Sequence, residues 1–504
     1  MWLLVGLLLL CLFLCAVLIE RQPSAWDALG YQVAGRNIVR GIGPAIEHPL
    51  NEELGPYFTL AAFAGQSPRR PSRLYLNYPP GLPLLLAIPQ WAGLPSFLVL
   101  PVLSTMSVLF TYLLGSLLLD RPAGVLGAAV VAFTPVFLEW GTSIWADLPG
   151  TCFMLGALAA YVAAWRKKSR ARRVVLGGLS GTLVVIATFI KYSNVLILLP
   201  LFAYGLYVQR LRILHSTINW VLVAAVILGL AGVGLYNYAI YGNPLETHYS
   251  TSRSGYSFPI FSLSYALGPS PADGYSLIGA AKTLWENFSW LLVLAVLGLA
   301  RAPRRAGVLL GTLFLIYLGM SSTFAWAPVN EDTRYLLPLF APVGLFAAWG
   351  CLSIRDLAVS WKKWALGIAL LALAVTSLSS IPTSWHHLQQ RNRAGLSFLG
   401  EMQSLTDGSQ PDAVFLAYLW NDPINYFGGR TTLFYRRMNF LDRAEFTDEL
   451  TRVVTALLQD SRPVYYVVDR QPSFADSLEI LRQHFHLRLW KEEPIPVYEV
   501  LLPK

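Results

Sequence analysis

The first residues of the chain, MWLLVGLLLLCLFLCAVLI at positions 1–19, contain no charged side chain. A helix needs about 20 consecutive apolar residues to cross the hydrocarbon core of a bilayer, so this stretch predicts a membrane-spanning helix. No basic segment precedes it, and the following residues, Ile19-Glu20-Arg21, do not resemble a signal-peptide cleavage site. We therefore expect a retained first span.

The composition extends this prediction to the rest of the chain. Of its 504 residues, 55% are hydrophobic and only 13% are charged, whereas a soluble domain carries about 25% charged residues. The four cysteines lie in apolar segments, without metal-ligand spacing or a disulfide framework, so we interpret them as small core residues. The chain is predicted to be a polytopic α-helical membrane protein.

Apolar segments of bilayer length recur through the first three quarters of the chain. We expect about eleven spans, at residues 2–19, 98–119, 122–138, 149–165, 174–190, 193–208, 218–240, 288–300, 306–325, 335–352 and 364–381. The apolar run at residues 81–91 holds two prolines, and counting it as a span would invert every later loop. We therefore predict a re-entrant or interfacial helix there.

The loops differ strongly in charge. With a cytoplasmic N-terminus, the loops on that side carry 15 Lys and Arg residues and two acids, whereas 12 of the 14 acids before residue 382 fall on the other side. This asymmetry follows the positive-inside rule and predicts a multi-pass plasma (inner) membrane protein with its N-terminus in the cytoplasm. The net charge of +9 then indicates contact with lipid headgroups, not a nucleic-acid partner.

The composition changes after residue 381, where apolar segments of bilayer length end. Four short segments have the periodicities of strands and amphipathic helices: strands at 413–418 and 463–468, and helices at 446–459 and 474–485. We expect a transmembrane domain over residues 1–381, with its first outer loop at 20–97, and a small extracytoplasmic α/β domain over residues 382–504.

Ionisable and aromatic side chains gather in the loops that this topology places outside. Asp27 lies just beyond the first span, and an ionisable residue at such a boundary indicates a functional site. A carboxylate can accept a proton from an attacking hydroxyl, and Lys or Arg can bind a phosphate and stabilise it as a leaving group. The candidate residues are Asp27, Tyr31, Tyr78, Glu139, Asp147, Lys191, His248, Arg253 and Arg334.

Several candidates also have an ordinary structural interpretation. Asp147 precedes a Leu-Pro pair and is suited to cap the next helix. Lys191 is placed to extend to the membrane surface, and Arg334 to end a span. Asp27 and His248 are compatible with solvated loop positions. These alternatives stay open at this stage.

Five motifs then follow one another in order. They are Trp26-Asp27-Ala28-Leu29-Gly30-Tyr31, Asn77-Tyr78-Pro79-Pro80-Gly81, Trp145-Ala146-Asp147-Leu148-Pro149, Tyr241-Gly242-Asn243-Pro244-Leu245-Glu246 and Asp332-Thr333-Arg334-Tyr335-Leu336-Leu337-Pro338. Their order over roughly residues 1–381 resembles the GT-C superfamily of membrane glycosyltransferases. It is most similar to the bacterial branch related to protein O-mannosyltransferases and lipid A aminoarabinose transferases.

The resemblance implies transfer of a sugar from a polyprenyl-phosphate-linked donor to an acceptor lipid, glycan or protein at the outer face of the membrane, with inversion. Asp27 and Asp147 match the catalytic acids of the first and second outer loops, and Arg334 and Lys191 match cations expected near the donor phosphate. We assign Arg253 to the phosphate as well. The expected substrate-binding residues are Tyr31, Tyr78, Glu139 and His248.

The chain departs from the family pattern at two positions. Ala28 follows Asp27 where many mannosyltransferases have Glu, and Asp147 stands alone where oligosaccharyltransferases have Asp-x-Asp. We therefore assign no cofactor and leave a divalent metal open, with Glu139 as the second acid.

Two other functions are compatible with a polytopic membrane protein. The first alternative is a transporter or flippase of lipid-linked sugars. Spans that are nearly free of charge, and the lack of a clear internal repeat, favour the enzyme. A membrane anchor for the C-terminal domain would not need eleven spans.

Overall fold

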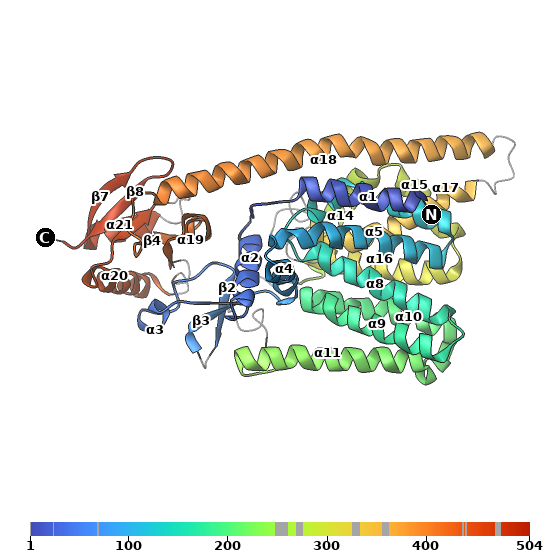
Figure 1. The fold of residues 1–504 in the computed structure, drawn as a ribbon, viewed down its shortest axis with the longest axis horizontal. Helices are drawn as coiled ribbons and strands as arrows, with labels where there is room; N and C mark the ends of the chain where they lie inside the picture. Colours follow the sequence, from blue (N-terminus) through green and yellow to red (C-terminus); the bar gives the residue numbers. More distant parts are fainter. Residues whose placement is uncertain are drawn as a thin grey trace. The chain divides into compact units, whose positions relative to one another are not determined.

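The structure is a computed structural model that describes residues 2–23, 25–67, 70–246, 261–268, 276–324, 333–354, 362–435, 438, 441–468 and 475–503. The chain divides into two compact units, coloured by sequence in Figure 1. Residues 1–20, 93–233 and 256–389 form what we call the helical unit, and residues 21–92, 234–255 and 390–504 form the mixed unit.

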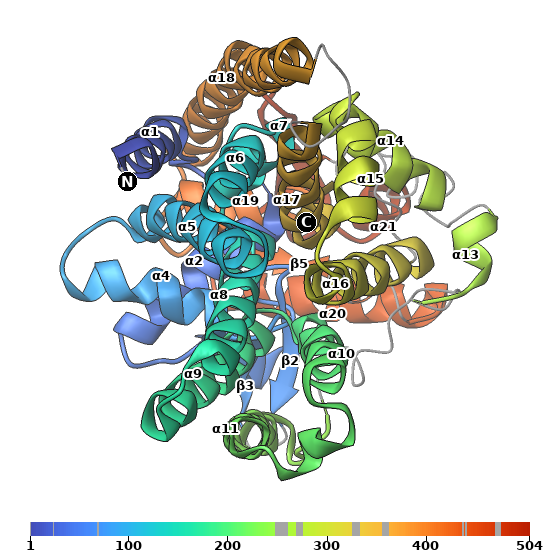
Figure 2. The same cartoon turned by 90° about the vertical axis from the view of Figure 1, so that its right-hand side faces the viewer.

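The helical unit consists of apolar helices joined by short connections. Its main helices are α1 (Trp2–Leu18), α5 (Val99–Leu118), α6 (Arg121–Ala132), α7 (Pro135–Gly141), α8 (Asp147–Arg166), α9 (Arg170–Ile190), α10 (Leu198–Gln209), α11 (Thr217–Tyr241), α14 (Ser276–Phe288), α15 (Leu291–Arg301), α16 (Arg304–Thr323) and α17 (Leu337–Ser353). In both views α8 packs between α5 and α9 (Figures 1 and 2). In α8 and α17, 89% of the apolar stretch is buried, so these two helices form the centre of the unit.

The number of spans differs from the prediction. Among the described residues, seven helices are long and apolar enough to cross a bilayer, or nine if each of two bent helix pairs counts as one span. About eleven were expected. The first predicted span corresponds to α1, a helix of 17 residues, which is at the lower limit of the length that crosses a bilayer.

One predicted span is broken, and another begins at a sharp bend. The segment expected at 122–138 forms α6 and α7, which bend by 70° at Phe133-Thr134. Pro135 starts α7, and a proline disfavours helical geometry at the residue before it. The segment expected at 288–300 corresponds to α15, and the bend of 99° between α14 and α15 lies at its start. Here Ser289 adopts a positive φ of 47°, a conformation that cannot continue a right-handed helix.

Helices α15 and α17 approach each other closely through two glycines. A Cβ atom on Gly298 would lie 1.8 Å from the carbonyl oxygen of Phe346, and one on Gly350 would lie 1.9 Å from that of Leu294. Any side chain at these positions would push the backbones apart. Small residues are a common means of close helix packing in membranes.

The last expected span, at 364–381, lies within a much longer helix. Helix α18 runs from Lys362 to Thr406 over 45 residues and contains Pro382 without ending there. The domain boundary predicted at residue 381 falls inside this helix, and the domain limits stay a prediction.

The N-terminal part of the mixed unit contains three helices and a small sheet. These are α2 (Trp26–Val39), α3 (Leu50–Glu53), α4 (Gly81–Trp91) and the antiparallel strands β1 (Ala45–Glu47), β2 (Phe63–Ser67) and β3 (Arg70–Leu76), in the order β1-β3-β2. Helix α4 has the bounds predicted for the re-entrant or interfacial helix. Its Leu82 and Leu86 are buried and α4 packs on α2, whereas Ile88 and Trp91 are exposed.

The C-terminal part of the mixed unit is the predicted α/β fold. Its five strands have the order β5-β4-β6-β8-β7, with β4 parallel to both of its neighbours. The elements are β4 (Val414–Ala417), α19 (Asn421–Gly428), β5 (Thr431–Phe434), α20 (Arg443–Gln459), β6 (Val464–Val467), α21 (Ala475–His484), β7 (His486–Lys491) and β8 (Val497–Leu501). Both predicted strands and both predicted helices are confirmed.

The two parts of the mixed unit share one hydrophobic core. Leu50 and Phe58 from the N-terminal part pack with strands β4 to β6 and helix α20. The backbone N–H of Phe434 donates to the carbonyl of Tyr57 at 2.8 Å, and the Tyr57 hydroxyl donates to Glu449 at 2.8 Å. Residues near 57 are thereby built into the α/β fold, which the sequence did not predict.

Candidate functional site

Asp147 is the first residue of α8, and its side chain is only 7% exposed. The N-cap position belongs to Ala146, and no side-chain hydrogen bond caps the helix. The capping interpretation of Asp147 is therefore wrong. Its position in the first turn still favours a negative charge, because the helix dipole is positive there.

Lys191 lies where α9 gives way to the 3-10 helix η2 (Tyr192–Ile197), and its backbone is extended. Its Nζ atom donates to Asp147 Oδ1 at 2.5 Å and lies 4.3 Å from the centre of the Tyr335 ring. The side chain is 26% exposed. A buried carboxylate thus holds the ammonium group, and Lys191 is one of the residues that line the adjoining cavity.

Arg334 lies in the 3-10 helix η4 (Thr333–Leu336), directly before α17. Its Nε atom is 3.6 Å from Asp147 Oδ2, and Nη2 donates to the Tyr335 hydroxyl at 3.1 Å. The guanidinium carbon lies 3.6 Å from the centre of the Trp145 ring, a distance that gives a favourable cation–π contact. Arg334 is therefore a fixed part of the unit's interior and not simply the end of a span.

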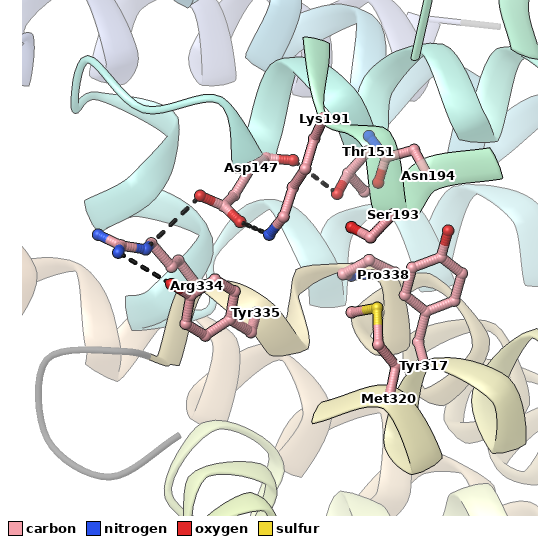
Figure 3. Close-up of a pocket in the computed structure, with 10 residues that line it drawn as sticks. All are labelled: Asp147, Thr151, Lys191, Ser193, Asn194, Tyr317, Met320, Arg334, Tyr335 and Pro338. Carbon is pink, nitrogen blue, oxygen red and sulfur yellow. Dashed lines mark hydrogen bonds and ion pairs between the residues drawn. The ribbon is translucent and has the colours of Figure 1, made fainter. Parts of the chain in front are cut away.

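These three residues lie together at a cavity, as Figure 3 shows, with the Asp147 carboxylate between the two cations. The space around these groups that no atom fills is about 220 Å³, including the part that is open to solvent. Its lining is Asp147, Thr151, Lys191, Ser193, Asn194, Tyr317, Met320, Arg334, Tyr335 and Pro338. We call Asp147, Lys191 and Arg334 the ionic cluster.

The charges of the ionic cluster do not cancel. One carboxylate meets two cations, so the cluster carries a net charge of +1 when all three groups are ionised. Arg guanidinium and Lys ammonium groups both bind phosphate by charge-assisted hydrogen bonds. The cavity is therefore chemically suited to an anion with polar oxygen atoms.

The mixed unit contains a second group of predicted site residues. The Tyr78 hydroxyl donates to Asp27 Oδ1 at 2.5 Å, and the rings of Tyr31 and Tyr78 lie 5.2 Å apart. Asp27 and Tyr31 are one turn apart on α2, so they lie on the same helix face. Three residues predicted from separate positions are thus brought together.

The remaining predicted residues are placed differently. Glu139 lies on α7, where its carbonyl accepts the Ser143 hydroxyl at 2.6 Å; it is not among the described residues that line the cavity. His248 and Arg253 lie outside the described residues.

The structure also reveals functional candidates that the sequence reasoning missed. Asp422, in the first turn of α19, is 1% exposed and accepts the backbone N–H of Ala61 at 2.7 Å. Glu20 is also 1% exposed and accepts the N–H of Ile144 at 3.0 Å, three residues before Asp147. Both are acids in short polar stretches, and only their burial distinguishes them from solvated loop residues.

Two tryptophans that were not among the predicted site residues contact the ionic cluster or its neighbours. Trp140 and Trp145 make an edge-to-face contact with ring centres 5.8 Å apart. The Trp140 indole N–H donates to the Thr333 hydroxyl at 3.0 Å. Trp140 therefore fixes the residue that precedes Arg334.

Comparisons with known proteins agree with this architecture. The sequence model of the family described as dolichyl-phosphate-mannose-protein mannosyltransferase matches residues 83–236, and no curated protein sequence matches the chain. The crystal structure of ArnT from Cupriavidus metallidurans bound to undecaprenyl phosphate is similar over 99% of both chains, with a TM-score of 0.66 and 12% identity. The chain has the GT-C fold. The resemblance predicted from the order of the sequence motifs is thereby confirmed.

Other GT-C structures match over a smaller share of their own length. The archaeal oligosaccharyltransferase AglB from Archaeoglobus fulgidus, in complex with an inhibitory peptide and a dolichol-phosphate, is similar over 98% of this chain and 74% of that chain, with a TM-score of 0.56 and 10% identity. The oligosaccharyltransferase of the same organism in complex with Zn and sulfate matches over 98% and 73%, with a TM-score of 0.53 and 12% identity.

The metal of that last complex raises the question whether this chain offers a divalent metal site. Within the described ranges, no group of three or more His, Cys, Asp and Glu residues could hold a metal ion. Asp147 presents its two oxygens to Lys191 and Arg334, and both cations would repel a divalent ion. The ionic cluster thus fits an anion and does not fit a divalent metal.

Proposed function

We propose that the protein is a glycosyltransferase that moves a sugar from a polyprenyl-phosphate-linked donor to an acceptor hydroxyl, with inversion, at the outer face of the membrane. The observation that carries this proposal is the ionic cluster, with its net positive charge and its adjoining cavity. It supplies what a phosphate-bearing donor requires. The GT-C fold and the match to the mannosyltransferase family support the same reaction class.

In the proposed reaction, Lys191 and Arg334 bind the donor phosphate. The bond between the anomeric carbon and the phosphate oxygen breaks, and the electron pair leaves with the polyprenyl phosphate. The two cations stabilise the charge that develops on this leaving group. Arg253, assigned from the sequence, would contribute a further cation.

Asp27 is the proposed base. Its carboxylate accepts the proton of the acceptor hydroxyl, whose oxygen forms the new bond to the anomeric carbon from the opposite side. The Tyr78 hydroxyl, 2.5 Å from Asp27 Oδ1, holds the carboxylate in one orientation. Asp147 holds both phosphate-binding cations in place and so orients the donor, while Tyr31 contributes an aromatic surface near Asp27 that is suited to a sugar ring.

We place these groups outside and the N-terminus in the cytoplasm. The support is the charge asymmetry of the loops, in which the Lys- and Arg-rich segments all fall on one side. The partners would be a lipid-linked sugar and an acceptor lipid, glycan or protein.

The proposal is tested with purified protein and membrane-extracted lipid-linked sugars, by measuring both the transferred sugar and the released polyprenyl phosphate. The wild type should produce the two in equal amounts, and Asp27→Asn and Asp27→Ala should each lose most of this activity. Glu53→Gln, which changes an exposed acid of the same unit, serves as the matched control and should keep full activity.

Two results would contradict the proposal. Full activity of both Asp27 variants would remove Asp27 from the mechanism. Movement of the intact lipid-linked sugar across a vesicle membrane, without release of polyprenyl phosphate, would instead identify a flippase.

A further inference from the structure

A buried acid of the α/β fold lies in the same unit as Asp27. Asp422 Oδ1 accepts two hydrogen bonds, from the N–H of Ala61 and from Nδ2 of Asn421, each at 2.7 Å. Its Oδ2 atom is buried and has no hydrogen-bond partner among the described residues. Burial raises the pKa of Asp422 to about 7, and the charge of Asp27 contributes to this increase.

A continuous series of contacts leads from Asp422 to Asp27. The backbone N–H of Ala61 donates a hydrogen bond to Asp422. The backbone carbonyl of Ala61 accepts a hydrogen bond from Nδ2 of Asn77 at 3.2 Å. The next residue along the chain is Tyr78, whose hydroxyl donates to Asp27 at 2.5 Å. The segment that carries the Tyr78 hydroxyl is thus held in place from the side of Asp422.

Two further contacts fix the elements at both ends of this series. Asn421 Nδ2 also donates to the carbonyl of Thr59 at 2.8 Å, so α19 binds the backbone of the first loop on both sides of Leu60. The Tyr426 hydroxyl of α19 donates to Gln32 of α2, the helix that carries Asp27. A movement of α19 would therefore displace both the Tyr78 segment and α2.

We propose that Asp422 is a positioning residue for the Asp27 base, acting through Ala61, Asn77 and Tyr78. The inference rests on the proposed function and adds that the C-terminal α/β fold contributes a residue to catalysis. Asp422 has no part in donor binding in this proposal. Its substitution should therefore lower kcat and leave KM for the donor unchanged.

The test compares the kinetics of Asp422→Asn, Asp422→Ala, Tyr78→Phe and the Asp422→Ala/Tyr78→Phe double variant. Asn keeps an oxygen that accepts the Ala61 N–H, so Asp422→Asn should stay within about 3-fold of the wild-type kcat. Ala removes that acceptor, and kcat should fall at least about 10-fold with KM for the donor within about 2-fold. Tyr78→Phe already removes the hydrogen bond that joins this series of contacts to Asp27. The kcat of the double variant should therefore be about equal to that of the slower single variant.

The control is Asp442→Ala. Asp442 is the exposed N-cap of α20 in the same unit, so its loss removes a structural hydrogen bond without touching the series. Its kcat should match the wild type, and its effect should be independent of Tyr78→Phe.

Several outcomes would overturn the inference. They are an Asp422→Ala variant with wild-type kcat, a rise in KM that accounts for the whole effect, and a double variant whose loss equals the product of the two single losses. In each of these cases the wild type and its dependence on Asp27 stay intact, so only this inference fails. A wild type that transfers no sugar would instead remove the proposed function and, with it, this inference.

Discussion

The charge balance of the ionic cluster predicts that two substitutions will change anion affinity in opposite directions. Asp147→Asn removes the carboxylate charge and raises the net charge of the cluster from +1 to +2. Lys191→Met removes an ammonium charge, keeps an unbranched side chain, and lowers the net charge to zero. An anion such as polyprenyl phosphate should therefore bind more tightly to the first variant and more weakly to the second.

The magnitude follows from the geometry. Lys191 Nζ lies 2.5 Å from Asp147 Oδ1, and a phosphate oxygen bound to the same ammonium would be about 2.8 Å away. The phosphate charge would thus be roughly 5 Å from the carboxylate. Two unit charges at that distance repel by about 3 kcal/mol at an effective dielectric constant of about 20, and by about 0.8 kcal/mol at the value of water, about 80. Asp147→Asn should tighten binding by roughly 4- to 160-fold.

The assay is equilibrium binding of polyprenyl phosphate to purified protein in detergent, at one fixed ionic strength, because surface electrostatics depend on salt. Lys282→Met is the matched control, since Lys282 is 61% exposed and pairs only with Glu286 at 3.8 Å among the described ion pairs. Its affinity should equal that of the wild type.

A shift in the same direction for Asp147→Asn and Lys191→Met would refute the electrostatic reasoning. So would a control that weakens binding as much as Lys191→Met. Sugar transfer measured on the same preparations separates binding from chemistry. If Asp147 also orients the donor, Asp147→Asn will bind polyprenyl phosphate more tightly and transfer sugar more slowly.

Three further predictions concern the mixed unit and the helix packing. Tyr78→Phe removes a hydrogen bond to the Asp27 carboxylate and should lower kcat by about 10- to 100-fold, measured by sugar transfer. The pKa of Asp422 is raised to about 7 in the folded state, so the fold binds an extra proton between about pH 4 and 7 and loses up to roughly 4 kcal/mol of stability as pH rises through that range. Thermal unfolding at pH 5 and 8 should show about 3 kcal/mol of this loss in the wild type and none of it in Asp422→Asn, and an equal loss in both would contradict it. Gly298→Ala would place a methyl group against the backbone of α17 and should lower the unfolding temperature, whereas Gly311→Ala, with open space around it, should not.

The sequence predicted the chemistry of the ionic cluster better than its geometry. Asp147, Lys191 and Arg334 were identified because charged residues at the ends of apolar segments are rare and costly. Their convergence on one carboxylate depends on how three separate helix ends pack, which no local pattern encodes. The contact between Arg334 and Trp145 was missed for a different reason. A tryptophan near a span is ordinarily explained as a residue of the membrane interface.

The span count was less predictable than the fold class. Hydropathy identifies apolar segments but does not reveal a sharp bend within one, as at Phe133-Thr134, where the segment expected at 122–138 bends by 70°. Helix α18 shows that the end of an apolar segment need not be the end of a helix, because α18 continues past residue 381 into the polar residues that follow. The composition of a segment indicates whether its surroundings are apolar or polar, but it does not determine where a helix ends.

The positions of the charged residues follow from a physical constraint on apolar helices. Within such a helix the backbone groups are satisfied internally, and a charged side chain has no partner. At a break the backbone turns, and polar side chains from different helices can meet. Asp147 begins α8, Lys191 lies between α9 and η2, and Arg334 lies in η4 before α17, so every member of the ionic cluster stands at such a break. Apolar packing then holds these ends in a fixed arrangement around one cavity. The breaks between helices therefore create the place where the three charged groups meet.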